Sequence, residues 1–124
     1  MVIVPGGFGS RKLSKDADFI TWLKTAESCL LKVSVCTGAL ILGAAGFLKN
    51  MKATTHPSAF EELRKYCLQV ENSRIVDEGE VIIARGVTSS IDFGLYLCKR
   101  LAGDKAREEI SRWIIPPPMV VAYS

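Results

Sequence analysis

Two kinds of hydrophobic pattern alternate along the chain. Short runs of consecutive apolar residues are typical of strands buried in a parallel sheet, and apolar residues repeated every three or four positions are typical of helices that bury one face. The runs predict strands over residues 1–4, 32–35, 52–55, 68–70, 74–76 and 81–84. The repeats predict helices over residues 15–27, 37–45, 58–66, 85–102 and 104–115. Strands that alternate with helices indicate an α/β fold with a mainly parallel sheet.

The predicted helices have recognisable ends and apolar stripes. Ser14 can cap the first helix, Ser58 and Glu61 form a capping box, and Asp104 can cap the last helix. The side chains expected to face inward are Phe19, Ile20, Leu23 and Ala26, then Phe60, Leu63 and Cys67, then Ile91, Leu95, Cys98 and Leu101, and finally Ala106, Ile110 and Trp113.

The composition is that of one soluble globular domain, with 48% hydrophobic and 23% charged residues among 124. We expect this domain to cover residues 1–115 and the proline-rich residues 116–124 to form an extended C-terminal tail. The net charge is +3, and because Lys and Arg are scattered, a nucleic-acid partner is not favoured. No apolar run approaches the about 20 residues of a membrane span, and the N-terminus lacks a signal-peptide pattern. We therefore expect a cytoplasmic protein.

Four cysteines and one histidine limit the metal and redox chemistry. Cys29, Cys36, Cys67 and Cys98 show no C-x-x-C spacing, and His56 is the single histidine, so we expect neither a metal site nor a cofactor. In the cytoplasm these cysteines are expected to be reduced. Cys67 and Cys98 fall on apolar stripes and are interpreted as core residues.

Cys36 stands where an apolar, β-branched run stops and a helix rich in small residues begins. A strand, a sharp turn that carries the nucleophile and a helix in direct succession form the pattern of a nucleophile elbow, in which Ser34 and Gly38 supply small flanking side chains. Unpaired N–H groups and the helix dipole at the first turn favour a thiolate over a thiol. The alternative is that Cys36 is a small hydrophobic core residue.

Two more segments are expected at the same edge of the sheet, because ligands of parallel α/β sheets bind beyond the carboxyl ends of the strands. They are the Pro5–Gly9 loop and the strand end Thr54–His56. The glycines let the loop approach a ligand closely, or they simply form a tight strand-to-helix turn. The loop lacks the spacing and the lysine of a phosphate loop, so it gives little support to nucleotide binding. His56 can line the pocket, cap the next helix or bond a backbone carbonyl.

Four segments in this order make the chain resemble the ThiJ/PfpI family, the superfamily of parkinsonism-associated deglycases and isonitrile hydratases. The segments are Val4-Pro5-Gly6-Gly7, Val35-Cys36-Thr37-Gly38-Ala39, Ala53-Thr54-Thr55-His56 and Gly86-Val87-Thr88-Ser89-Ser90-Ile91-Asp92. The resemblance runs from residue 1 to about residue 106. It implies a flavodoxin-like parallel sheet with helices on both faces, as in class I glutamine amidotransferases, and a homodimer or higher homo-oligomer.

The resemblance also implies the roles of five residues. Cys36 would be the nucleophile, His56 would lie in the pocket, and backbone N–H groups of Thr37 and of Gly6 or Gly7 would form an oxyanion site. Protease-like and amidotransferase-like members carry a histidine directly after the cysteine, where this chain has Thr37. Cys-Thr-Gly is similar to the isonitrile hydratase branch and to the ligand domains of certain AraC-type regulators, but no helix-turn-helix region follows here.

Family members have further strands and helices before the Pro-Gly-Gly strand, including a loop carboxylate that hydrogen-bonds the cysteine sulfur. This chain begins after that point, so the resemblance implies an N-terminally truncated sheet that lacks its first strands. By residue type alone, Asp92 and Glu61 are candidates to replace that carboxylate, and helix capping is their alternative role. The open sheet edge would invite pairing with another chain.

Three functions are compatible with these residues. The first is a hydratase or hydrolase in which Cys36 adds to a small electrophilic substrate, such as an isonitrile or a reactive aldehyde, and water completes the reaction. The second is a non-catalytic redox or stress sensor in which Cys36 is oxidised to a sulfenic or sulfinic acid. The third is an inactive, truncated family member whose one property is association.

Overall fold

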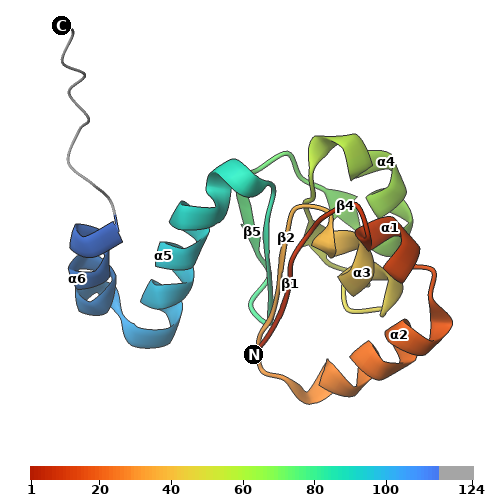
Figure 1. The fold of residues 1–124 in the computed structure, drawn as a ribbon, viewed down its shortest axis with the longest axis horizontal. Coiled ribbons are helices and arrows are strands. Elements are labelled where there is room, and N and C mark those ends of the chain that lie inside the picture. The colour runs from red at the N-terminus through yellow and green to blue at the C-terminus, as the bar shows by residue number, and fades with distance from the viewer. Residues whose placement is uncertain (115–124) are drawn as a thin grey trace, which may run out of the picture. The chain divides into compact units, whose positions relative to one another are not determined.

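The computed structural model describes residues 1–114, so the predicted tail, residues 116–124, lies outside the described residues. The chain divides into one compact unit that covers Met1–Ser90 and a second that begins at Ile91. The first unit contains a four-stranded sheet in the order β1-β2-β6-β5 and a separate two-stranded sheet, β3-β4 (Figure 1). Within the described residues, no helix is long and apolar enough to cross a membrane.

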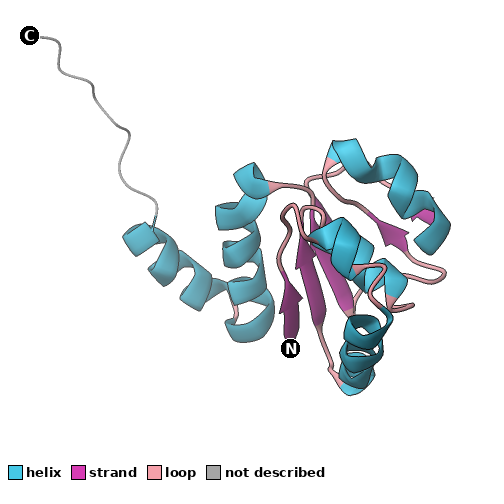
Figure 2. Cartoon of the chain, turned by 45° about the vertical axis from the view of Figure 1, so that its right-hand side comes forward, coloured by secondary structure: helices cyan, strands magenta, loops and turns pink. Residues whose placement is uncertain are grey.

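The larger sheet confirms the predicted mainly parallel architecture. Strands β1 (Val2–Val4), β2 (Lys32–Val35) and β6 (Val81–Ala84) run parallel, and β5 (Ile75–Asp77) pairs antiparallel with β6. Figure 2 shows these strands as neighbouring arrows. In the register of β2 and β6, Val35 lies beside Ala84, so both strands end at the same edge of the sheet.

The predicted strand over residues 52–55 is shorter in the structure and belongs to the smaller sheet. Strand β3 (Lys52–Ala53) pairs in parallel with β4 (Gln69–Val70), and Thr54 and Thr55 follow it as irregular backbone. Thr55 Oγ1 instead donates to the carbonyl oxygen of Cys36 at 2.8 Å. This bond brings the residues just before His56 to the end of β2.

The helices of the first unit are short. They are α1 (Ser10–Leu13), α2 (Ala17–Leu23), α3 (Gly38–Ala44) and α4 (Phe60–Leu63), with 3-10 turns η1 (Lys24–Ser28), η2 (Pro57–Ala59), η3 (Arg64–Tyr66) and η4 (Val87–Ser89). The helix predicted over residues 15–27 is present as α2 followed directly by η1, residues 17–28, but the predicted cap at Ser14 was wrong. Ser14 ends α1, and Asp16 caps α2 by accepting from the Phe19 N–H at 3.1 Å. A carboxylate oxygen satisfies one of the unpaired N–H groups that every helix start leaves.

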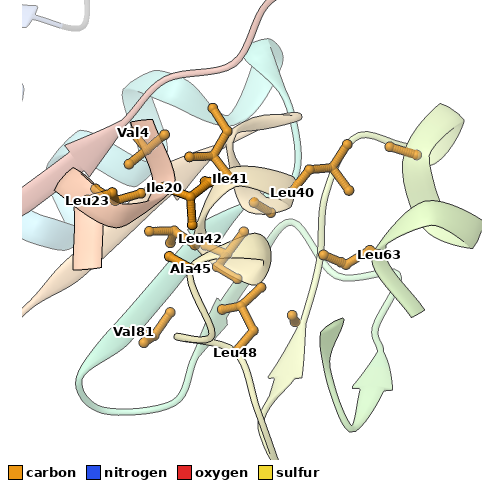
Figure 3. Close-up of a cluster of buried hydrophobic side chains, with 14 residues drawn as sticks. Val4, Ile20, Leu23, Leu40, Ile41, Leu42, Ala45, Leu48, Leu63 and Val81 are labelled. Atoms are coloured by element: carbon orange, nitrogen blue, oxygen red, sulfur yellow. The ribbon is translucent and has the colours of Figure 1, made fainter. Parts of the chain in front are cut away.

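The core of the first unit is built around α3. Leu40 and Leu42 on this helix and Leu48 after it are at most 2% exposed. Figure 3 shows them among side chains contributed by β1, α2, α4 and β6, of which Val4, Ile20, Leu63 and Val81 are labelled. Burying large aliphatic side chains in this way stabilises a fold by roughly 1.5–3 kcal/mol each.

Two glycines let α3 approach its neighbours closely. A Cβ at Gly38 would lie 2.3 Å from the carbonyl oxygen of Val4, and a Cβ at Gly43 would lie 2.6 Å from the Cβ of Tyr66. Neither contact is possible between real atoms, so both positions require glycine for packing. The close contact at Gly38 sets how near the end of β1 comes to the start of α3.

The second unit contains α5 (Ser90–Ala102), except for its first residue, and α6 (Asp104–Ile114). The predicted apolar stripes of these helices were wrong in part. Leu95 is buried as expected, but Ile91, Leu101, Ile110 and Trp113 are 40–87% exposed. Helical periodicity identifies the apolar side of a helix, whereas burial also requires another element to cover that side.

Candidate active site

Cys36 has a backbone conformation that is rare for residues other than glycine. Its φ is +58°, in the left-handed region, and it lies directly after β2 and before the Thr37 N-cap of α3. Among the described residues other than glycine, only Asn50 also has a positive φ, and asparagine tolerates that region well. Strain of this kind costs about 1–3 kcal/mol and collects at functional sites. The local geometry therefore matches the predicted elbow.

Hydrogen bonds fix the backbone of Cys36. Its N–H donates to the carbonyl oxygen of Ala84 at 2.9 Å, which continues the pairing of β2 with β6 by one residue. Its carbonyl oxygen accepts from Thr55 Oγ1 at 2.8 Å. The thiol is therefore carried on a rigid turn tied to two other segments of the unit.

Gly6 lies directly against the elbow. A Cβ at this position would be 2.8 Å from the Cβ of Cys36 and 3.0 Å from the backbone nitrogen of Thr37. Only a residue without a side chain lets the loop come this close. Neither the Gly6 N–H nor the Thr37 N–H has an acceptor among residues 1–114, so both remain available as donors.

Gly7 plays a different part from Gly6. Its φ is +140°, and its N–H donates to Thr37 Oγ1 at 3.1 Å. The Thr37 hydroxyl lies 3.0 Å from Ser10 Oγ and 3.2 Å from the Gly7 carbonyl oxygen. Its one proton can be donated to either of these oxygens. The Thr37 side chain thus anchors the glycine loop to the elbow, a role that no local sequence pattern indicates.

A cavity of about 320 Å³ opens beside Cys36 and brings together the three segments that the sequence placed at this edge. The glycine loop, the elbow and the segment after β3 contribute most of its lining, together with Arg11 of α1 and Val87 of η4. The lining residues are Gly7, Phe8, Arg11, Cys36, Thr37, His56, Ser58 and Val87. A mainly apolar hollow of about 410 Å³ also reaches Cys36, and its walls include Pro5, Gly6 and Val35. The thiol can therefore be reached by a small molecule.

His56 caps the 3-10 turn that follows it, which corrects the predicted capping box. Its Nδ1 accepts from the Ser58 N–H at 3.2 Å and lies 2.8 Å from Ser58 Oγ. Ser58 is therefore not the N-cap, because its own N–H is the group that is capped. An Nδ1 that accepts leaves the neutral ring's proton on Nε2. His56 thus both caps the turn and lines the cavity, so two of the predicted alternatives hold together.

Charged residues around the cavity were not all foreseen. Arg11 lines the cavity and its Nε lies 2.8 and 3.0 Å from the two carboxylate oxygens of Glu62. Nothing in the local sequence signals this contact, because 51 positions separate the two residues. Glu61, proposed by residue type as a partner of the thiol, pairs instead with Arg64 at 2.9 Å on the surface and does not line the cavity beside Cys36. Asp92 belongs to the second unit.

The other three cysteines, Cys29, Cys67 and Cys98, are free and half-buried. Burial raises the pKa of the Cys67 thiol, while a backbone hydrogen bond from Gln69 and the charge of Arg64 act against that increase. Residues 1–114 contain no cluster of His, Cys, Asp or Glu side chains suited to a metal ion.

Comparison with known proteins yields consistent matches. Residues 1–100 match the DJ-1/PfpI family. The chain is 36% identical over 104 residues to the isonitrile hydratase of Pseudomonas putida, a match that covers 83% of the chain and 46% of that protein. It is 29% identical over 121 residues to protein DJ-1 homolog A of Arabidopsis thaliana, with 95% of the chain and 31% of that protein covered. The chain thus spans half or less of the length of these relatives.

Solved structures give the same result for the fold. A THiJ/PfpI family protein from Pseudomonas syringae superimposes with a TM-score of 0.82 at 30% identity and covers 96% of this chain and 52% of its own. DJ-1beta of Drosophila melanogaster gives a TM-score of 0.80 at 26% identity and covers 98% of this chain and 64% of its own. These likenesses confirm the predicted flavodoxin-like class.

Proposed function

The chain belongs to the DJ-1/PfpI family, and on that premise we propose that it is a cysteine-dependent hydratase or hydrolase that acts on a small electrophilic molecule. Cys36 is the nucleophile of this proposal. The observation that carries it is the φ of +58° at Cys36, with the unbonded N–H groups of Gly6 and Thr37 beside it. A strained turn that presents a thiol to a cavity beside two free donors is the arrangement that nucleophilic catalysis uses.

An isonitrile, R–N≡C, illustrates the chemistry, because a relative at 36% identity is named for it. The Cys36 thiolate adds to the terminal carbon and one proton is taken up, which gives the thioimidate R–N=CH–S. Water then adds to that carbon, the C–S bond breaks and the proton is returned. The product is the formamide R–NH–CHO, and the net reaction is the addition of one water molecule.

The same residues would stabilise the charges that develop. In the tetrahedral intermediate, the N–H groups of Gly6 and Thr37 would donate to the oxygen derived from water. The Nε2–H of His56 would supply a proton at the edge of the cavity. The Gly7 N–H is not assigned a part, because it already donates to Thr37 Oγ1.

The proposal also includes the cellular location of the protein and its assembly into oligomers. Free cysteines suit a reducing compartment, so we place the protein in the cytoplasm. Apolar side chains exposed on the described surface, such as Met1, Ile3 and Trp113, suit a homodimer or higher homo-oligomer.

Variants at His56 test the proposal. With p-tolyl isonitrile or methylglyoxal as substrate, we expect His56→Ala to slow product formation by about 100-fold, because the proton donor is lost. The same change should lower the free energy of unfolding by about 1 kcal/mol, because the cap at Ser58 is lost as well. Product formation is followed by liquid chromatography, and stability is followed by urea unfolding.

His56→Asn separates the two roles. Asparagine is a good N-cap but has no ring that reaches the cavity, so this variant should recover the stability without the activity. Recovery of both would mean that His56 acts only as a cap. If the unmodified chain forms no product from either substrate while peroxide adds oxygen to Cys36 alone, the enzyme proposal fails and a redox sensor takes its place.

A further inference from the structure

A second cavity adjoins the one beside Cys36. It has a volume of about 400 Å³, and its walls include Asn72, Arg85 and Thr88. His56 and Val87 line both cavities, so the two share a boundary. A molecule bound at the thiol therefore lies next to this second cavity, on the other side of His56 and Val87.

Arg85 occupies the position on β6 that Cys36 occupies on β2. Val35 and Ala84 are partners in the parallel register, and Cys36 and Arg85 are the next residues of each strand. The Cys36 N–H also donates to the Ala84 carbonyl oxygen at 2.9 Å. Neighbouring strands lie about 4.8 Å apart, so the thiol and the guanidinium start from adjacent backbone positions.

The positive charge of Arg85 has no anionic partner among the described residues. Its Nη1 donates to the neutral amide of Asn72, whose Oδ1 lies 2.8 Å away. Because Asn72 accepts with its oxygen, its NH₂ group keeps its donors. Arg11 in the neighbouring cavity differs, since Glu62 already balances its charge.

We propose that the cavity lined by Arg85 and Asn72 binds an anionic group, a carboxylate or a phosphate, of the substrate that Cys36 attacks. This inference rests on the proposed function and narrows its substrate to small electrophiles that carry a negative charge a few bonds from the reactive carbon. A guanidinium beside a neutral amide provides several N–H donors and no competing carboxylate, which is the recognition chemistry of carboxylates and phosphates.

Two alkylating reagents with the same reactive group test the proposal. N-iodoacetylglycine carries a carboxylate, and N-iodoacetylglycinamide carries a neutral amide of nearly the same size. In both reactions the Cys36 sulfur forms a bond to the CH₂ carbon and iodide leaves. We expect Cys36 to react roughly tenfold faster with the carboxylate reagent, the effect of a single charge-assisted hydrogen bond. Rates are read by mass spectrometry, with Cys29 and Cys98 in the same molecule as references.

Variants assign the preference to Arg85. Arg85→Gln should bring the ratio of the two rates to about one. Arg64→Gln changes the net charge equally at an exposed residue that lines neither cavity, so it should leave the ratio as it is. A preference that survives Arg85→Gln, or that is lost equally in Arg64→Gln, would overturn the proposal.

The outcomes separate this inference from the function on which it rests. Fast labelling of Cys36 by both reagents, with a ratio near one, keeps the nucleophile and rejects the anion subsite. If Cys36 labels no faster than Cys29, the proposed function fails, and the subsite is then tested without the thiol. For this test, the Nε–H NMR signal of Arg85 is identified as the arginine signal that disappears in Arg85→Gln. In Cys36→Ala protein, N-acetylglycine should shift this signal, whereas N-acetylglycinamide should leave it unchanged. No selective shift would reject the subsite as well.

Discussion

Replacing Cys36 with serine is expected to lower the rate of product formation by at least about a thousandfold. A serine hydroxyl is a weak nucleophile unless a base activates it, and the proposed mechanism begins with a thiolate. Serine keeps the Cβ of cysteine and has a smaller terminal atom, so it adds no new contact with Gly6. The fold should therefore survive while the chemistry is lost.

The matched control for this prediction is Cys98→Ser, which makes the same substitution on α5. Both variants are compared with the unmodified chain by turnover of p-tolyl isonitrile and of methylglyoxal. Cys98→Ser should keep the full rate. Retention of more than about a tenth of the rate by Cys36→Ser would remove Cys36 from the mechanism.

The largest effect on stability is expected for Gly38→Ala, at about 3 kcal/mol. The added methyl group would stand 2.3 Å from the Val4 carbonyl oxygen and 2.8 Å from that of Pro5. Both neighbours are backbone atoms of the segment that leads into the glycine loop, so relieving the overlap must move that segment. We therefore expect slower labelling of Cys36 in this variant as well, because Gly6 would leave its place beside the elbow.

Gly94→Ala on α5 is the control for that prediction. No atom lies within 4 Å of a Cβ at this position, and alanine favours a helix over glycine by about 1 kcal/mol. Urea unfolding should show Gly94→Ala at least as stable as the unmodified chain and Gly38→Ala well below it. Equal stability of the two variants would contradict the close contact between α3 and the end of β1.

Local sequence patterns were sufficient to predict the elbow. The run of residues 32–35 and the small residues after Cys36 carry their own structural preferences, and β2 and α3 form where those patterns predict them. The approach of the glycine loop to Cys36 was also predicted, because the parallel strands β1 and β2 bring their carboxyl ends to one edge. His56 lies at this edge as predicted, but it follows β3 of the smaller sheet, and the hydrogen bond from Thr55 to Cys36 brings it there. The family resemblance added the roles expected of these residues, which remain proposals for this chain.

Contacts between distant residues could not be predicted in the same way. The Arg11–Glu62 pair and the hydrogen bond from Arg85 to Asn72 depend on tertiary packing, which leaves no periodic trace in the sequence. The cap at Asp16 was missed for a different reason, and the cap at His56 was predicted only as one of three alternatives. Each lies two residues from a serine that is itself a good cap, and backbone geometry, not residue type, selects between them.

The rate of alkylation of Cys36 by iodoacetamide as a function of pH tests the central claim most directly. Mass spectrometry follows all four cysteines in one reaction, so Cys29 and Cys98 serve as references and Cys67, whose thiol pKa is raised by burial, should require the highest pH. Our account predicts that Cys36 is labelled faster than any other cysteine at each pH, because the elbow presents its sulfur to the cavity beside two free N–H donors. A Cys36 profile that coincides with that of Cys29 or Cys98 would contradict the account, since the strained turn would then present an ordinary thiol.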